Sequence, residues 1–163
     1  MSSGSKINRD TSLKIATWNI RSLRRKDKLV NVIREMKRAG ISILGLSETH
    51  WKEDGDFDSE GIRVIHAGGE QSQRGVALLL DERTARSVTK IDRCSDRILR
   101  VKIQAKPINI QVYMPTTAAD DEEIDTIYDH LEEMLDEEKL ELNMLYQWEI
   151  GIQFKSMMHI SHN

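Results

Sequence analysis

A strand, a helix and a second strand can be read from the periodicity of residues 13–46. Leu13 to Ile20 is short and rich in residues that favour β-structure, which predicts a strand. A helix is expected from about Lys26 to Arg38, with Gly40 at the expected cap. Its apolar residues follow the i, i+3, i+4, i+7 spacing: Leu29, Val32, Ile33 and Met36. Ile41 to Leu46 is almost wholly apolar, which indicates a strand buried on both faces. This order predicts an α/β fold.

Strands dominate the sequence after an acidic stretch that runs from Glu53 to Gly61. Residues 62–66, 75–80 and 85–91 are each expected to form a strand. Residues 99–104 and 108–113 alternate apolar and polar side chains, so each strand should place one face on a core. The short connection between them suits a hairpin.

A second helix is expected after Thr117, with Asp120 in a capping arrangement. One apolar stripe supports it: Ile124, Ile127, Tyr128, Leu131, Met134 and Leu135. Beyond Glu141 no period persists, which leaves either a final strand from Trp148 to Phe154 or a poorly ordered tail. We therefore expect a flexible leader over residues 1–12, one domain over 13–136 and a divergent tail over 137–163.

The net charge of −3 hides a strong asymmetry along the chain. Between Leu13 and Met114 there are 20 Lys and Arg residues against 13 Asp and Glu. Between Asp120 and Glu141 there are 12 acidic residues and a single Lys. The basic part is either ordinary solvated surface or a footprint for a polyanion, and charge alone does not decide.

Several common protein classes are excluded by motifs that the sequence lacks. No apolar run reaches the roughly 20 residues of a membrane helix, and the first residues lack a secretory signal pattern. The single cysteine, Cys94, has no disulfide partner and no neighbour at zinc spacing. An intracellular protein of the nucleus or cytoplasm is therefore expected. No phosphate-binding glycine loop, dinucleotide fingerprint or nucleophile elbow is found.

Three polar residues fall at the ends of predicted strands: Asn19, Glu48 and Tyr113. In α/β scaffolds, loops from neighbouring strands converge at strand ends and form sites there. A carboxylate and an amide oxygen suit Mg²⁺, and a phenol can hydrogen-bond a phosphate oxygen. The alternative is that each residue is a cap, a turn former or an ordinary satisfied polar group.

Four segments, in this order, resemble the endonuclease/exonuclease/phosphatase superfamily. They are residues 13–20 (LKIATWNI), 44–51 (LGLSETHW), 74–79 (RGVALL) and 110–116 (IQVYMPT). They are most similar to the apurinic-type endonuclease domain of non-LTR retrotransposons, over about Leu13 to Leu135. The resemblance implies a four-layer α/β/β/α sandwich of the DNase I-like type that hydrolyses phosphodiesters with Mg²⁺ or Mn²⁺.

The same resemblance implies roles for individual residues. Glu48 would be a metal ligand, Asn19 would orient it or the attacking water, and Tyr113 would contact the scissile phosphate. The implied phosphate or DNA contacts are Arg21, His50, Trp51 and Arg74. Arg21 departs from the apurinic endonucleases, which have an acidic residue at that position.

Two family motifs are not found after Leu135: the Gly-Asp-Phe-Asn strand end and the Asp-His pair that carries the general base. Losing one member of a catalytic unit can remove several orders of magnitude of rate. The sequence therefore predicts a truncated copy with little or no catalysis. The alternatives are a non-catalytic DNA- or protein-binding remnant, or a half-domain that pairs with another chain through an exposed sheet.

Overall fold

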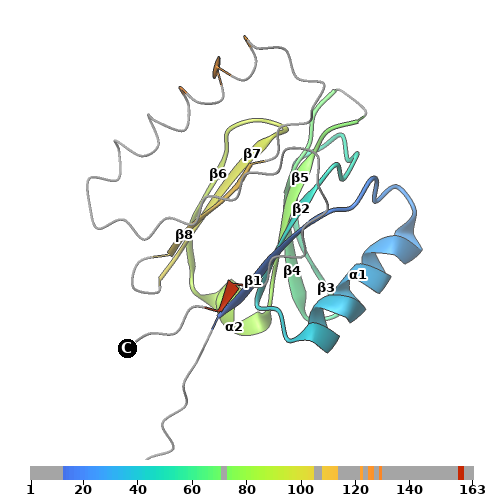
Figure 1. Cartoon of the computed structure of the whole chain (residues 1–163), viewed down its shortest axis with the longest axis vertical. Helices are drawn as coiled ribbons and strands as arrows, with labels where there is room; N and C mark the ends of the chain where they lie inside the picture. The colour runs from blue at the N-terminus through green and yellow to red at the C-terminus, as the bar shows by residue number, and fades with distance from the viewer. Residues whose placement is uncertain are drawn as a thin grey trace, which may run out of the picture.

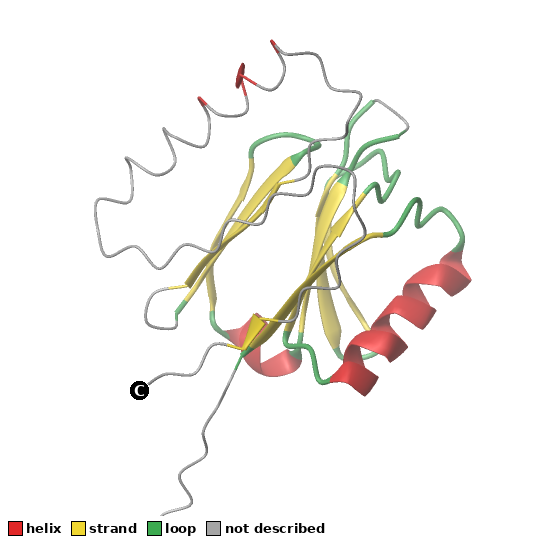
Figure 2. Ribbon diagram, viewed as in Figure 1, coloured by secondary structure: helices red, strands yellow, loops and turns green. Residues whose placement is uncertain are grey.

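The computed structural model describes residues 13–70, 73–104 and 108–113, together with residues 122, 125–126, 129 and 158–159. The elements, in chain order, are β1 (Lys14–Asn19), α1 (Lys26–Ala39), β2 (Ile43–Ser47), β3 (Gly55–Ser59), β4 (Ile62–Ala67), β5 (Val76–Leu80), α2 (Glu82–Arg86), β6 (Val88–Arg93), β7 (Ile98–Ile103), β8 (Ile108–Tyr113) and β9 (Met158–His159). They form a sheet ordered β3-β4-β5-β2-β1-β9 and a sheet ordered β6-β7-β8. Figures 1 and 2 show that the two sheets lie face to face, with α1 on the outer side of the larger one.

The predicted strand–helix–strand unit is confirmed. β1 and β2 are parallel neighbours, and α1 crosses between them with Val32, Ile33 and Met36 buried. The helix ends at Gly40, whose φ of 65° is left-handed and whose N–H donates to the Lys37 carbonyl at 3.1 Å. Glycine adopts this conformation without the penalty that a Cβ would bring, which explains its place at the cap.

Two apolar cores hold the layers together. The first lies between α1 and the larger sheet, and includes Ile33, Leu46 and Leu79. The second lies between the two sheets and includes Leu78, Leu99 and Val101. The alternation predicted for residues 99–104 therefore places its apolar face on the second core. The α/β fold class is confirmed.

Two local predictions differ from the structure. Residues 55–59 form β3, which sequence reasoning did not predict because its three central residues are Asp, Phe and Asp. The strand predicted over 85–91 begins only at Val88, because α2 occupies residues 82–86. The Asp81 side chain accepts a hydrogen bond from the Thr84 N–H at 2.7 Å, and this N-cap starts the short helix.

Several predictions lie wholly or largely outside the described residues: the leader, most of the helix after Thr117, and the possible strand over 148–154. The domain boundaries stay predictions. Within the expected tail, β9 pairs antiparallel with β1, with Lys14 opposite His159. In the part of the chain that the structure describes, neither helix combines the length and apolar character needed to cross a bilayer.

Candidate functional site

The strand register brings Asn19 and Glu48 to one end of the larger sheet. Asn19 is the last residue of β1 and lies opposite Ser47, the last residue of parallel strand β2. Glu48 follows directly. The Asn19 Nδ2 donates a hydrogen bond to the Glu48 Oε1 at 2.9 Å. Two of the three side chains that the strand-end argument singled out are therefore hydrogen-bonded to each other.

The orientation of the Asn19 amide is fixed from both sides. Its Oδ1 accepts a hydrogen bond from the Arg21 N–H at 3.2 Å, while its Nδ2 points to Glu48. An amide flipped by half a turn would place a donor against the Arg21 N–H and an acceptor against a carboxylate, which would lose both bonds. Asn19 therefore holds one carboxylate oxygen in place.

The backbone around this pair adopts left-handed conformations at residues that are not glycine. Arg21, Ser22, Glu48 and His50 have φ values of 50°, 95°, 54° and 60°. The two loops are joined by backbone hydrogen bonds from Ser22 to the Glu48 carbonyl at 2.6 Å and from Leu23 to the Thr49 carbonyl at 2.8 Å. Such conformations cost of order 1–3 kcal/mol each and persist only where the surrounding structure enforces them. Sequence reasoning missed this feature, because no glycine marks it.

Arg74 and His50 lie on the neighbouring loops of the same end. The His50 N–H donates to the Arg74 carbonyl at 2.8 Å. The Arg74 guanidinium lies 3.8 Å from the Asp96 carboxylate, and the Asp96 carbonyl accepts from the Gly75 N–H at 3.1 Å. Asp96, which sequence reasoning did not select, therefore joins the second sheet to this end of the first. Its position just before an alternating strand was the available signal.

Tyr113 is placed by its backbone at the corresponding end of the second sheet. It is the last residue of β8 and lies opposite Ile98, two residues after Asp96. The strand register therefore agrees with a rim shared by both sheets. Its side chain is outside what the structure describes.

Trp51 is partly buried. Its Nε1 donates to the Leu23 carbonyl at 3.3 Å, and its ring packs against the core beneath α1. The ring centroid lies 4.6 Å from that of His66 and 6.1 Å from that of Phe57. These contacts support a packing role. The structure places Trp51 in this aromatic cluster, and its role as a phosphate or DNA contact stays a prediction.

The loop between β1 and α1 is strongly basic and starts at the Asn19–Glu48 pair. The loop carries Arg21, Arg24 and Arg25, and the first turn of α1 adds Lys26 and Lys28 together with one acid, Asp27. Arg25 pairs with Asp27 at 2.7 Å, and the Lys28 ammonium donates to the Ile20 carbonyl at 2.6 Å. Arg21 is exposed. A local excess of positive charge thus follows Asn19 directly in the chain.

Comparison with known proteins identifies the architecture. An AP endonuclease from Archaeoglobus fulgidus superposes with a TM-score of 0.56 and 24% identity, over 77% of this chain and 52% of that chain. The 3′ phosphatase NExo from Neisseria, solved with a product DNA hairpin, superposes with a TM-score of 0.56 and 18% identity, over 76% of this chain and 53% of that chain. The chain has the endonuclease/exonuclease/phosphatase fold. The AP endonuclease LMAP from Leishmania major has the same fold, with a TM-score of 0.53 and 13% identity over 83% of this chain and 50% of that chain.

The sequence relatives are longer proteins. Over 126 residues, this member of the fold is 36% identical to craniofacial development protein 2 of Bos taurus and 35% identical to that of Tragulus javanicus. Each match covers 75% of this chain but only 21% and 22% of the two relatives, so the chain spans about a fifth of their length. No protein-family model matches the chain.

His66, in the aromatic cluster, gives a prediction for the pH dependence of stability. Burial lowers the pKa of His66, against a backbone hydrogen bond at Glu53 that raises it. A histidine with a lowered folded pKa stabilises the fold above its unfolded pKa of about 6.5 and loses that stability as the pH falls. We expect the free energy of unfolding, measured with urea, to fall between about pH 7.5 and 5.

The control for this prediction is His66→Phe, which keeps an aromatic ring and removes the titrating group. This variant should lose less stability than the parent over the same pH interval. An equal loss in both proteins would show that His66 does not cause the change.

Proposed function

We propose that this chain forms the metal-ligand side of a divalent-cation-dependent phosphodiesterase site, and that it binds nucleic acid through the adjoining basic loop. The contact between Asn19 and Glu48, 2.9 Å apart at the end of two parallel strands, carries the proposal. It supplies an oriented carboxylate beside a concentration of positive charge. Glu48 is the proposed cation ligand, Asn19 orients it, and Tyr113 is the proposed phosphate contact.

The donor set fits Mg²⁺ or Mn²⁺ held weakly. Mg²⁺ commonly uses one or two carboxylates and completes its shell with waters and substrate phosphate. In the described ranges, no group of three or more His, Cys, Asp or Glu side chains lies close enough to hold a metal ion. Such a cation would neutralise charge on a phosphate and lower the pKa of bound water. Glu48 would therefore hold the cation weakly, with waters or a substrate phosphate completing the shell.

Little or no phosphodiester cleavage is proposed for this chain by itself. The resemblance implies that a Gly-Asp-Phe-Asn segment and an Asp-His pair would position the water and accept its proton. The first does not occur in this sequence, and no Asp-His pair follows Leu135; the Asp129–His130 dipeptide lies earlier, in the segment predicted as the second helix. With Mg²⁺ present, purified protein should leave supercoiled plasmid and abasic-site DNA uncut. Robust cleavage that disappears in Glu48→Ala would show that the catalytic unit is complete. Pairing with another chain through an exposed sheet stays a prediction.

Affinity for DNA should depend steeply on salt. Each neutralised phosphate contributes a slope of about −0.9 to the logarithm of affinity against the logarithm of salt for duplex DNA. Arg21→Gln should lower the magnitude of that slope by about one and weaken binding to unrelated sequences alike. The measurement is fluorescence anisotropy of a labelled duplex between about 50 and 200 mM salt.

Arg86→Gln is the matched control, because it removes the same charge from α2, which follows the opposite end of β5. Its slope should equal that of the parent. Affinity that stays flat across the salt range, or equal effects of the two variants, would contradict a role for the basic loop.

A further inference from the structure

The outer edge of β3 is an open sheet edge. β3 is the first strand of the larger sheet and pairs with β4 on one side. Within the described residues, no strand pairs with its other side. A row of backbone N–H and C=O groups on such an edge can accept an additional strand. The question is whether the edge also carries features that select a partner.

An exposed aromatic side chain lies at the centre of this edge. Phe57 is 39% exposed, although it lies opposite Val64, which is buried in the core beneath α1. Its ring centroid lies 5.9 Å from that of His66 and 6.1 Å from that of Trp51. One side of the ring therefore packs against His66 and Trp51, and the exposed part of the ring could be covered by an apolar side chain on an added strand.

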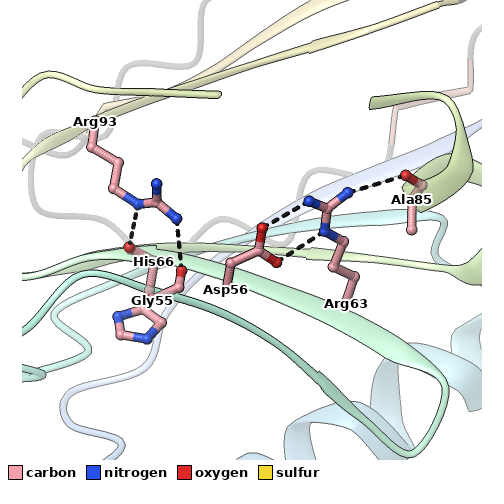
Figure 3. Close-up of polar contacts among 6 residues, drawn as sticks. All are labelled: Gly55, Asp56, Arg63, His66, Ala85 and Arg93. Atoms are coloured by element: carbon pink, nitrogen blue, oxygen red, sulfur yellow. Dashed lines mark hydrogen bonds and ion pairs between the residues drawn. The ribbon is translucent and has the colours of Figure 1, made fainter. Parts of the chain in front are cut away.

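Two arginines fix the β3–β4 hairpin to the rest of the molecule, as Figure 3 shows. The Arg93 guanidinium, from β6, donates to the carbonyls of His66 and Gly55 at 3.1 and 3.0 Å. Arg63 makes a bidentate pair with Asp56 at 2.9 and 2.7 Å and donates to the Ala85 carbonyl at 3.3 Å. Because the edge is held in place beforehand, a partner strand would lose little affinity to ordering it.

The charge of the edge determines the chemistry of the partner. Acidic residues flank and interrupt the strand: Glu53, Asp54, Asp56, Asp58 and Glu60. A second copy paired about a twofold axis at Phe57 would set Asp56 against Asp58, and like charges directly opposite each other are unfavourable. Asp56 is already paired with Arg63, so a basic side chain would gain most opposite Asp58, whose side chain accepts a hydrogen bond from the uncharged Gly61 N–H. The edge thus disfavours self-pairing and favours a basic strand.

We propose that the outer edge of β3 binds an extended basic peptide of another protein as an added strand. An apolar residue of the peptide lies opposite Phe57, and basic residues lie opposite Asp56 and Asp58. This surface is separated from Glu48 by β4 and β5, because the sheet order is β3-β4-β5-β2. The proposal is therefore independent of the cation site and can be tested without it.

The test uses the full chain and a labelled nine-residue peptide with Lys at every second position and Val between them. Fluorescence anisotropy should show saturable binding that weakens as salt is raised. Asp58→Asn should weaken binding about threefold, because it removes the charge. The substitution keeps the side-chain oxygen that accepts from the Gly61 N–H at 3.1 Å, so the turn is retained. Phe57→Ser should weaken binding about fivefold.

Matched controls separate strand addition from simple charge attraction. Asp27→Asn removes the same charge from an exposed position on α1 and should leave the affinity unchanged. A peptide with alternate backbone amides N-methylated keeps its charge but cannot complete the ladder, and it should bind at least about tenfold more weakly. Absence of binding, equal affinity of the methylated peptide, or equal effects of Asp58→Asn and Asp27→Asn would each overturn the proposal.

Discussion

Replacing Glu48 with glutamine is expected to weaken Mn²⁺ binding at least about tenfold, measured by the electron paramagnetic resonance signal of free Mn²⁺ during titration. Glutamine has the size of glutamate, and its oxygen can still accept the hydrogen bond that the Asn19 Nδ2 makes at 2.9 Å. The substitution therefore removes the negative charge while the local geometry is kept. If Glu48 is the ligand, the variant binds the cation more weakly because the negative charge of the carboxylate is gone.

Glu60→Gln is a closely matched control. Glu60 has a φ of 53°, against 54° for Glu48. The two sites therefore have the same residue type and the same backbone conformation, and each substitution removes one negative charge. Glu60 lies between β3 and β4, at the end of the sheet opposite to Asn19. Its variant should bind Mn²⁺ as the parent does. Unchanged binding in Glu48→Gln, or equal weakening in both variants, would remove Glu48 from the cation site.

Replacing Gly75 with alanine is expected to lower the free energy of unfolding by about 2–4 kcal/mol. Gly75 has a φ of 110°, which a residue with a Cβ rarely adopts. A Cβ there would also overlap the Thr49 Oγ1, in a side chain that is fully buried. The strain falls on backbone hydrogen bonds that Gly75 makes with Thr49 and Asp96, both at 3.1 Å. Urea unfolding of both proteins measures the difference.

Gly61→Ala isolates the backbone part of that effect. Gly61 has a φ of 77°, but a Cβ there would meet nothing within 4 Å. Its loss of stability should be about 1–2 kcal/mol, the cost of the left-handed conformation alone. If Gly75→Ala were no more destabilising than Gly61→Ala, the close approach of the Thr49 side chain would not be what requires glycine at position 75.

Local periodicity predicted much of the fold because it reports which faces are buried. Helix α1, which covers the first core, follows from the spacing of Val32, Ile33 and Met36, all of which are buried. The predicted strand–helix–strand unit agrees with the parallel pairing of β1 and β2, whereas their register, with Asn19 opposite Ser47, is seen only in the structure. β3 was missed, because it is stabilised by pairing with β4 and by hydrogen bonds from two arginines. Arg93 is distant in sequence, and Arg63 reaches Asp56 only once the two strands have paired.

The site divides in the same way between sequence and structure. The sequence determined that Asn19 and Glu48 stand at neighbouring strand ends, since strand order and length follow from local pattern. Their orientation was decided only in the tertiary structure: left-handed backbone at Glu48 and His50 is enforced by hydrogen bonds to loops around Ser22 and Arg74. Pattern reports what each segment prefers by itself, whereas these conformations oppose that preference and exist because distant segments supply the compensating bonds.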